Sequence, residues 1–348
     1  MRSNSRFIIF LLIGVVLTSG LESCKKQRLR RHKKKWIKNA FEALSENKYP
    51  RVKAISWWNE NFDNSKLRID ASKKSLKAYQ KGVASDVFIT EPVFSNGKLI
   101  PSEGIYHSAY PDFGGTEDVV SAERINEFES LAKKDIVWAY FSNNWYNSIS
   151  FPSDAVSVIY NAGKVPFIRM MARTNFDVGG PDENYTMQKI IDGDFDTELT
   201  QWANDAAALN YPILVEFGTE VNGDWFPWNG SYNGADETSY GDTQKTDGQE
   251  RFVDAYRHII DICNTAGADN ITWFFHVDAY SSPDVDWNNI SGYYPGDDYI
   301  DWLGVSVYGP QEPSEDYQSF TNIMDDVYPT LSSLSDKPIA VLEFAITE

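Results

Sequence analysis

The sequence predicts an α/β protein with a (β/α)8 TIM barrel, and two observations indicate this fold. From residue 104 onward, short β-rich runs alternate with amphipathic helical patterns, as expected for parallel strands joined by crossover helices. The last run, Ile339–Phe344, carries a carboxylate near its end, Glu343. The carboxyl ends of barrel strands are where this fold holds its functional groups.

Seven strands are expected after residue 104, which is one too few to close the barrel. They are Gly104–Tyr110, Ile136–Phe141, Val165–Met170, Ile213–Phe217, Ile271–His276, Trp302–Val307 and Ile339–Phe344. The spacing of apolar residues predicts helices between them. These helices are Val119–Ala132, Glu198–Leu209, Arg251–Thr265 and Tyr317–Leu334.

The eighth strand is expected at the N-terminal end of the chain. Lys34–Glu46 has apolar residues at helical spacing, Arg51–Trp58 is typical of a strand, and a second helix is expected over Ala71–Val83. This helix–strand–helix is what should follow Glu343 in an ordinary barrel. We interpret the order as a circular permutation, which nearby termini make tolerable; a truncated tandem and a gene-model artefact are the alternatives.

The chain divides into a leader at residues 1–24, a basic linker at 25–33 and a single barrel domain at 34–348. Arg2 and Arg6 precede an apolar run, Phe7–Leu17, that is too short to span a membrane and is typical of an export signal. Leu21–Cys24 resembles a lipoprotein cleavage box, which predicts a lipid anchor at Cys24 and a secreted or cell-envelope protein. The basic run that follows opposes translocation.

The charge of the chain narrows the classes of partner. The formal net charge is −18, and without the eight basic residues of positions 25–35 the remainder carries −26. This acidity argues against nucleic acid and anionic polymers, and it leaves neutral polysaccharides open. The four His and two Cys show no metal-ligand spacing. We expect no metal, no cofactor and a monomer.

Two carboxylates are the candidate catalytic groups. Hydrolysis of a glycosidic bond with retention needs two carboxyl groups about 5–5.5 Å apart. Counted from residue 104, Glu343 lies at the end of the seventh expected strand. Glu220 lies just beyond the fourth, among Gly and Asn residues and close to Trp225. Glu216 is also acidic, but it lies within its strand and is interpreted as a structural residue of the barrel.

The segment Thr219–Trp225 resembles the strand-four motif of glycoside hydrolase family 26, the β-mannanase family, written His-Glu-x-Asn-Gly-x-Trp. Residues 339–344 resemble its strand-seven motif, residues 293–309 its approach to strand six, and residues 36–79 its C-terminal end. The chain departs from the pattern at Thr219, where the family has His. This departure removes one contact expected near the sugar at the cleavage point.

The resemblance implies a role for each matching residue. Glu220 would be the acid/base and Glu343 the nucleophile, with Tyr308 donating a hydrogen bond to Glu343. Trp225 and one of Trp57 or Trp58 would form walls on which sugar rings stack. Glu220 must hold its proton while Glu343 is ionised, which apolar neighbours and the charge of Glu343 would favour.

Further candidate substrate contacts are His107, Asn144, Arg169 and His276, which fall at or near strand ends that should face the mouth of the barrel. Asn222, within the motif, and Trp228, just beyond it, are also candidates. For Arg169 an internal ion pair is the alternative, for His276 a satisfied core histidine, and for Trp228 a loop anchor.

The sequence thus predicts a retaining glycosidase that acts on β-1,4-mannan-type polysaccharide, similar to an endo-β-mannanase. A β-1,3/1,4-glucanase or a β-1,3-xylanase of the same fold is the alternative within enzymes. A non-catalytic glycan-binding lipoprotein at the cell surface is the alternative from another class.

Overall fold

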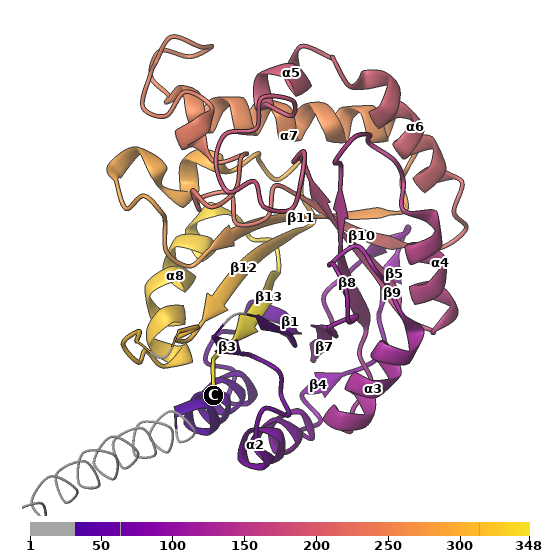
Figure 1. Cartoon of the computed structure of the whole chain (residues 1–348), viewed down its shortest axis with the longest axis vertical. Helices are drawn as coiled ribbons and strands as arrows, with labels where there is room; N and C mark the ends of the chain where they lie inside the picture. Colours follow the sequence, from indigo (N-terminus) through magenta and orange to yellow (C-terminus); the bar gives the residue numbers. More distant parts are fainter. Residues whose placement is uncertain (1–31, 63, 313) are drawn as a thin grey trace, which may run out of the picture.

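The computed structural model describes residues 32–62, 64–312 and 314–348. The predicted leader, Cys24 and most of the basic linker lie outside the described residues. Eight parallel strands form a closed barrel (Figure 1), which confirms the predicted fold. The barrel strands are β1 (Val52–Trp58), β7 (Ile105–Tyr110), β8 (Trp138–Asn144), β9 (Val165–Met171), β10 (Ile213–Phe217), β11 (Ile271–Asp278), β12 (Trp302–Tyr308) and β13 (Ile339–Ala345).

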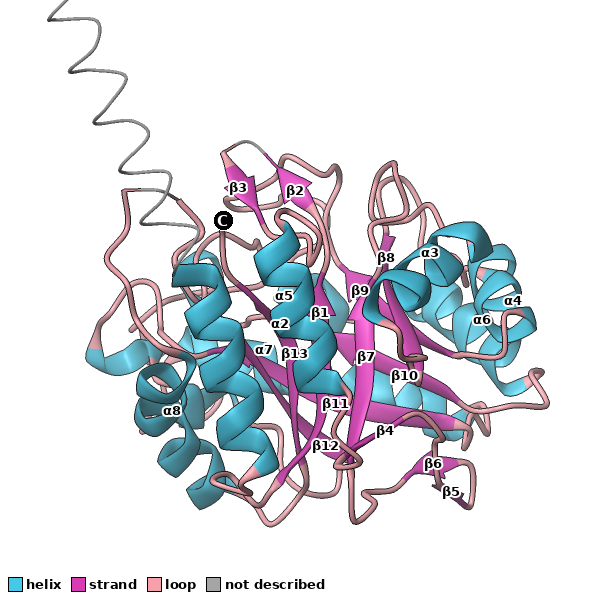
Figure 2. Ribbon diagram, turned by 90° about the horizontal axis from the view of Figure 1, so that it is seen from below, coloured by secondary structure: helices cyan, strands magenta, loops and turns pink. Residues whose placement is uncertain are grey.

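Helices cover the outside of the barrel (Figure 2). They are α2 (Lys73–Val83), α3 (Ala122–Ala132), α4 (Ser153–Asn161), α5 (Met187–Ile191), α6 (Asp196–Ala207), α7 (Asp247–Thr265) and α8 (Phe320–Leu334). Every residue of β7, β9, β10 and β13 is buried, because one strand face meets the barrel interior and the other meets the helices. This explains why apolar residues predominate in these strands, without a regular alternation with polar ones.

Short elements that the sequence analysis did not predict decorate the barrel. The antiparallel pairs β2 (Asn61–Phe62) with β3 (Ser65–Lys66) and β5 (Phe94–Ser95) with β6 (Lys98–Leu99) are hairpins, and β4 (Phe88–Ile89) adds a parallel strand beside β7. Three 3-10 turns are η1 (Gly230–Tyr232), η2 (Asp286–Asn288) and η3 (Ile290–Tyr293). Strands of two residues carry too little periodicity to be recognised in a sequence.

Strand β1 closes the barrel, as expected for the N-terminal strand, because it pairs in parallel with both β13 and β7. Counted from β1, Glu220 follows the fifth strand and Glu343 lies on the eighth, whereas the family pattern has the fourth and the seventh. The separation of three strands is the same. A sequentially wound barrel has the same pairing wherever the chain is cut, so circular permutation stays a prediction.

The N-terminal helix packs on the last strand. Residues 32–45 are helical, and the rings of Trp36 and Phe41 lie 6.1 and 6.3 Å from that of Phe344. The helix includes residues 32 and 33, which the sequence analysis assigned to the linker. The Lys33 ammonium is fully buried and donates to the carbonyls of Lys66, at 2.5 Å, and Arg68, at 2.9 Å. Burial lowers the pKa of Lys33 to about 7.

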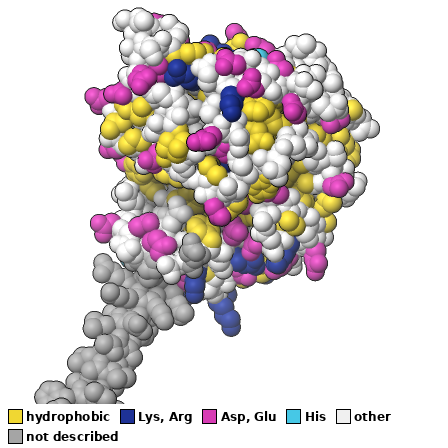
Figure 3. Space-filling view, turned by 45° about the horizontal axis from the view of Figure 1, so that its top comes forward, with side chains coloured by type: hydrophobic (Ala, Val, Ile, Leu, Met, Phe, Trp, Pro, Cys, Tyr) yellow, Lys and Arg dark blue, Asp and Glu magenta, His cyan; other side chains and the backbone are white. Residues whose placement is uncertain are grey.

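The C-terminal residues meet the same N-terminal segment (Figure 2). The Lys66 amide donates to Thr347 Oγ1 at 2.9 Å, and Ser75 Oγ donates to Glu348 Oε2 at 2.5 Å. On the face shown in Figure 3, acidic side chains are scattered widely and basic ones are few, in keeping with the net charge. None of the helices within the described residues has both the length and the hydropathy that crossing a membrane requires.

We predict that Trp57→Ala lowers the free energy of unfolding by about 3–5 kcal/mol. Trp57 is fully buried, its ring lies 5.0 Å from that of Phe344, and its Nε1 donates to the Leu67 carbonyl at 3.0 Å. Chemical denaturation measures this change. Val93→Ala is the control, because Val93 is exposed and its loss should alter stability by no more than about 0.5 kcal/mol. Equal midpoints for the two variants would contradict the role of β1 in closing the barrel.

Candidate active site

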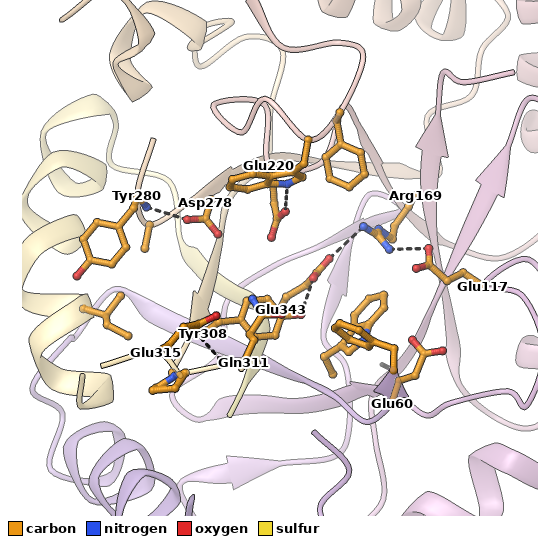
Figure 4. Close-up of a pocket in the computed structure, with 18 of the residues that line it drawn as sticks. Glu60, Glu117, Arg169, Glu220, Asp278, Tyr280, Tyr308, Gln311, Glu315 and Glu343 are labelled. Atoms are coloured by element: carbon orange, nitrogen blue, oxygen red, sulfur yellow. Dashed lines mark hydrogen bonds and ion pairs between the residues drawn. The ribbon is translucent and has the colours of Figure 1, made fainter. Parts of the chain in front are cut away.

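Glu220 and Glu343 lie together at the mouth of the barrel (Figure 4). Glu343 belongs to β13 and is 5% exposed, and Glu220 follows β10 and is 8% exposed. Carboxylate oxygens of the two residues lie within 4.8 Å of each other. The parallel register of the barrel brings them together, since the carboxyl ends of all strands meet at one rim.

A tight turn after β10 presents Glu220. Gly218 has a φ of +67° there, and a Cβ at this position would lie 2.5 Å from the Phe252 ring. Glu220 itself has a φ of 48°, a left-handed conformation that is uncommon for a residue other than glycine. Its carboxylate accepts a hydrogen bond from Trp225 Nε1 at 2.7 Å. Such strained residues are concentrated at functional sites.

Two side chains hold the carboxylate of Glu343. The hydroxyl of Tyr308, on β12, donates to Oε2 at 2.8 Å, and Arg169 Nη2, on β9, lies 3.2 Å from Oε1. Arg169 also contacts Glu117 Oε2 at 3.0 Å and lies 3.5 Å from Glu216 Oε1. Arg169 is therefore both an internal ion-pair partner and a residue of the site, so the two interpretations of the sequence are combined in one side chain.

Burial raises the pKa of Glu343 to about 7, while Arg169 favours the ionised form and Glu220 opposes it. Burial thus favours the neutral form of Glu343 more than water would, and Arg169 opposes this effect. The sequence analysis expected an ionised Glu343 and did not anticipate this shift. The depth of the carboxylate in the barrel, which causes the shift, is a property of the tertiary structure.

The carboxylate pair opens into a cavity of about 920 Å³. Among the described residues, five aromatic side chains are exposed by more than a third, and four of them line this cavity. These four are Phe62, Phe176, Trp225 and Tyr280. Trp58 also lines it, with its ring stacked on Tyr110 at 4.1 Å. Exposed aromatic faces beside a cavity are suited to stacking on the apolar faces of sugar rings.

A buried polar network lies beneath the two carboxylates. The carboxylate of Glu216 accepts hydrogen bonds from Tyr140 and from His276 Nδ1, the latter at 2.8 Å. Thr219 Oγ1 also lies 2.8 Å from His276 Nδ1, and Ser306 Oγ lies 2.9 Å from Nε2. All five side chains are buried. Glu216 is thus a structural residue of the barrel, as its place within the strand indicated.

Five predicted substrate contacts lie behind the cavity lining instead. Trp57 packs in the core, and His107 binds Tyr79 Oη and the Asp135 carbonyl, each at 2.8 Å. Asn144 binds Asp118 and Arg173. Asn222 binds the backbone of Asp278. Trp228 Nε1 donates to the Thr219 carbonyl at 2.7 Å. His276 does not line the cavity either. Proximity to a strand end predicted His107, Asn144 and His276, and the family resemblance predicted Trp57. Neither signal tells which way a side chain faces.

Asn222 and Trp228 nevertheless shape the site from behind. Trp228 anchors the carbonyl of Thr219, immediately before Glu220. Asn222 Nδ2 donates to the Asp278 carbonyl at 3.0 Å and its Oδ1 accepts from the Asp278 amide at 2.8 Å, which joins the loops after β10 and β11. These contacts fix the backbone that carries Glu220, so the loop-anchor interpretation holds for Trp228.

Five acids that the sequence analysis missed line the cavity: Glu60, Glu117, Asp278, Glu315 and Asp316. Asp278 and Tyr280 lie on one side of the carboxylate pair, and Glu60 and Glu117 lie on the other (Figure 4). Burial raises the pKa of Glu60 to about 7, and burial with the nearby charge of Glu220 raises that of Asp278. Asp278 directly follows His276 and Val277 in β11, so a carboxylate at a strand end was the available signal.

The side chains of Glu220, His276 and Glu343 bring three potential metal-ligand atoms within 4.8 Å of one another. A His ligand must offer a nitrogen lone pair to a metal. Both ring nitrogens of His276 already contact Glu216 and Ser306. The trio therefore fits a hydrogen-bonded network better than a metal centre.

A barrel with two carboxylates across its mouth is the arrangement used by retaining glycosidases. Residues 179–334 match the profile of Glycosyl hydrolase family 26. The predicted resemblance to this family is confirmed over these residues.

The curated relatives that the chain resembles are named for different activities. The chain is 32% identical over 241 residues to Endoglucanase H of Acetivibrio thermocellus, covering 67% of this chain and 24% of the relative. It is 23% identical to a beta-1,3-xylanase of an Alcaligenes species, and the match covers 62% of this chain and 40% of the relative. It is 28% identical to Mannan endo-1,4-beta-mannosidase A and B of Caldalkalibacillus mannanilyticus, and that match covers 47% of this chain and 25% of the relative. The chain thus spans less than half the length of these relatives.

Solved structures with a similar arrangement include a β-mannanase from a symbiotic protist of the termite Reticulitermes speratus. It is 13% identical to this chain, covers 83% of both chains and superimposes with a TM-score of 0.47.

We predict that the carboxyl group of Glu343 titrates with a midpoint near pH 7 in the free protein. The measurement is a 13C NMR titration of labelled glutamate carboxyl groups, with the Glu343 signal assigned by its loss in Glu343→Gln. Arg169→Met should move the midpoint upward, since the guanidinium favours the ionised form. A midpoint below 5 in the wild-type protein would contradict the effect of burial.

Proposed function

We propose that the protein is a retaining glycoside hydrolase that cleaves a neutral β-linked polysaccharide. The observation that carries this proposal is the pair of carboxylates whose oxygens lie within 4.8 Å across the barrel mouth. Retaining enzymes hold their carboxyl groups about 5–5.5 Å apart, whereas inverting enzymes leave about 6.5–9.5 Å for a water molecule. The match to family 26 supports the same class of reaction.

In the proposed mechanism Glu343 is the nucleophile. Tyr308 donates to Oε2, Arg169 Nη2 lies 3.2 Å from Oε1, and the carboxylate positioned in this way attacks the anomeric carbon. Glu220 donates its proton to the leaving glycosidic oxygen as the bond to the anomeric carbon breaks, and a covalent glycosyl-enzyme forms. Glu220 then accepts a proton from water, which attacks the anomeric carbon and releases Glu343.

We predict that Glu343→Gln lowers kcat on the hydrolysed polysaccharide by about 10³-fold or more, because the amide cannot form the glycosyl-enzyme. Reducing-sugar release measures the loss. Glu315→Gln is the control, because it makes the same Glu-to-Gln exchange elsewhere in the cavity lining. It should lower kcat far less than Glu343→Gln does. The first product, followed by NMR, should retain the β configuration. An inverted product, or more than a few per cent of wild-type turnover in Glu343→Gln, would rule out this mechanism.

For the substrate we propose a β-1,4-mannan-type polysaccharide first. The motif around Glu220 and the similarity to a mannan endo-1,4-beta-mannosidase support it. A β-glucan is the second candidate, favoured by the similarity to Endoglucanase H and by Thr219 in place of the family His. Reducing-sugar release from galactomannan, glucomannan, mixed-linkage glucan and β-1,3-xylan, with Glu343→Gln beside the wild type, distinguishes them. Export and lipid attachment at Cys24 remain proposals from the sequence.

The cavity extends on both sides of the carboxylate pair, which favours cleavage within a polymer (Figure 4). Phe62 in β2 and Phe176 after β9 are 41% and 46% exposed and line it. The Arg173 guanidinium lies 4.6 Å from the centre of the Phe176 ring and supports it from behind.

We predict that Phe62→Ala and Phe176→Ala each raise KM for the polymer by about 3- to 10-fold, which corresponds to roughly 0.6–1.4 kcal/mol of lost stacking. The rate on a short aryl glycoside should change less. Tyr160→Ala is the control, since Tyr160 is 46% exposed but lies outside the cavity. If Tyr160→Ala raises KM as much as the two Phe variants do, the platform role of Phe62 and Phe176 is wrong.

A further inference from the structure

His276 occupies a special place beneath the two carboxylates. It is fully buried and does not line the cavity, so it does not contact a substrate bound there. One of its ring nitrogens nevertheless lies within 4.8 Å of carboxylate oxygens of both Glu220 and Glu343. A charge on this ring would act on both residues through a medium with little water to screen it.

The partners of His276 favour the doubly protonated ring. Nδ1 lies 2.8 Å from Glu216 Oε2, an acceptor-only group when ionised, and Nε2 lies 2.9 Å from Ser306 Oγ. Burial lowers the pKa of His276, but the carboxylate of Glu216 outweighs it and the net shift is upward. The pKa of Glu216 is lowered, since His276 and Arg169 outweigh the burial that raises it. Both shifts favour an imidazolium that faces a carboxylate.

Titratable groups interact with His276 from four strands of the barrel or the loops that follow them. They are Tyr140 of β8, Glu216 of β10, Glu220 after β10, Asp278 of β11 itself and Glu343 of β13. Arg169 of β9 and Tyr308 of β12 contact Glu343 in turn. Arg169 and His276 are the two positive groups among these described side chains. Arg169 reaches Glu343 directly, and His276 acts on it from below.

Thr219 connects this arrangement to the departure from the family pattern. Where the pattern has His, Thr219 is fully buried, and its hydroxyl lies 2.8 Å from His276 Nδ1. An imidazole is thus present at this point of the barrel, but it comes from the neighbouring strand and lies one layer below the cavity. It cannot make the sugar contact implied for a His at position 219.

We propose that His276 is a positioning residue that, as an imidazolium, holds the nucleophile Glu343 in its ionised form, and that Thr219 and His276 form one unit in this chain. The inference rests on the proposed function for its kinetic consequence only. The electrostatic coupling between His276 and Glu343 exists in the free protein and can be measured without a substrate.

The first test uses NMR on the full chain without substrate. The 15N signals of the His276 ring, assigned by their loss in His276→Gln, should show a doubly protonated ring at pH 7. In Glu343→Gln the pKa of His276 should fall by about one unit, because removal of a nearby negative charge disfavours the imidazolium. Linkage requires that His276→Gln raises the pKa of Glu343 by the same amount. A neutral ring at pH 7, or no change in Glu343→Gln, overturns the proposal, and neither outcome depends on the folding of His276→Gln.

The second test is the pH profile of kcat/KM on the polysaccharide that the wild type hydrolyses. His276→Gln should move the acidic limb upward by about one pH unit, so that the loss of activity is large at pH 6 and smaller at pH 8. His107→Gln is the matched control, since His107 is equally buried in β7 and hydrogen bonded through both ring nitrogens, but burial lowers its pKa to about 4 and it carries no charge.

An equal loss at all pH values in His276→Gln, or the same shift in His107→Gln, would show a merely structural role and would overturn the proposal. If no polysaccharide is hydrolysed by the wild type, the proposed function fails, and the NMR titrations still decide whether His276 and Glu343 are coupled.

Discussion

The ion pair between Arg169 and Glu343 is the interaction on which the site depends. A carboxylate that is 5% exposed, in the interior of a barrel, would lose its charge without a partner. Arg169 provides that partner at 3.2 Å, and its remaining nitrogens face Glu117 and Glu216. Because the guanidinium lies between three carboxylates from different elements, it fixes their positions relative to one another. Glu216 in turn contacts His276, so the same network extends beneath Glu220.

This network places limits on the rest of the structure. Buried charges are tolerated only where their geometry is fixed, and here β8, β9, β10, β11 and β13 all contribute a partner. The barrel must therefore be closed for the site to exist. Strand β1 closes it between β13 and β7, and the aromatic contacts of Trp36 and Trp57 with Phe344 tie the N-terminal segment to the strand that carries Glu343. The N-terminal segment is thus a part of the active-site scaffold.

The cavity above the network has a different chemistry. Most of its exposed side chains are aromatic or acidic, and Arg169, the cation among its described lining residues, is already paired. Aromatic faces stack on sugars with little regard for which sugar is bound, and acids disfavour anionic chains. The cavity is therefore suited to a neutral glycan, as the proposed function requires.

The sequence by itself determined the barrel, its eight strands and the pair Glu220 and Glu343, because strand periodicity and carboxylates at strand ends are local patterns. It also identified Tyr308, Trp225 and Trp58 through the resemblance to family 26. Only the tertiary structure decided which residues near strand ends face the cavity. Trp57, His107 and Asn144 turned out to lie behind it, while Glu60, Glu117 and Asp278 line it. The raised pKa of Glu343 and the contact between Thr219 and His276 were likewise beyond the sequence, since burial and pairing between strands depend on residues far apart in the chain.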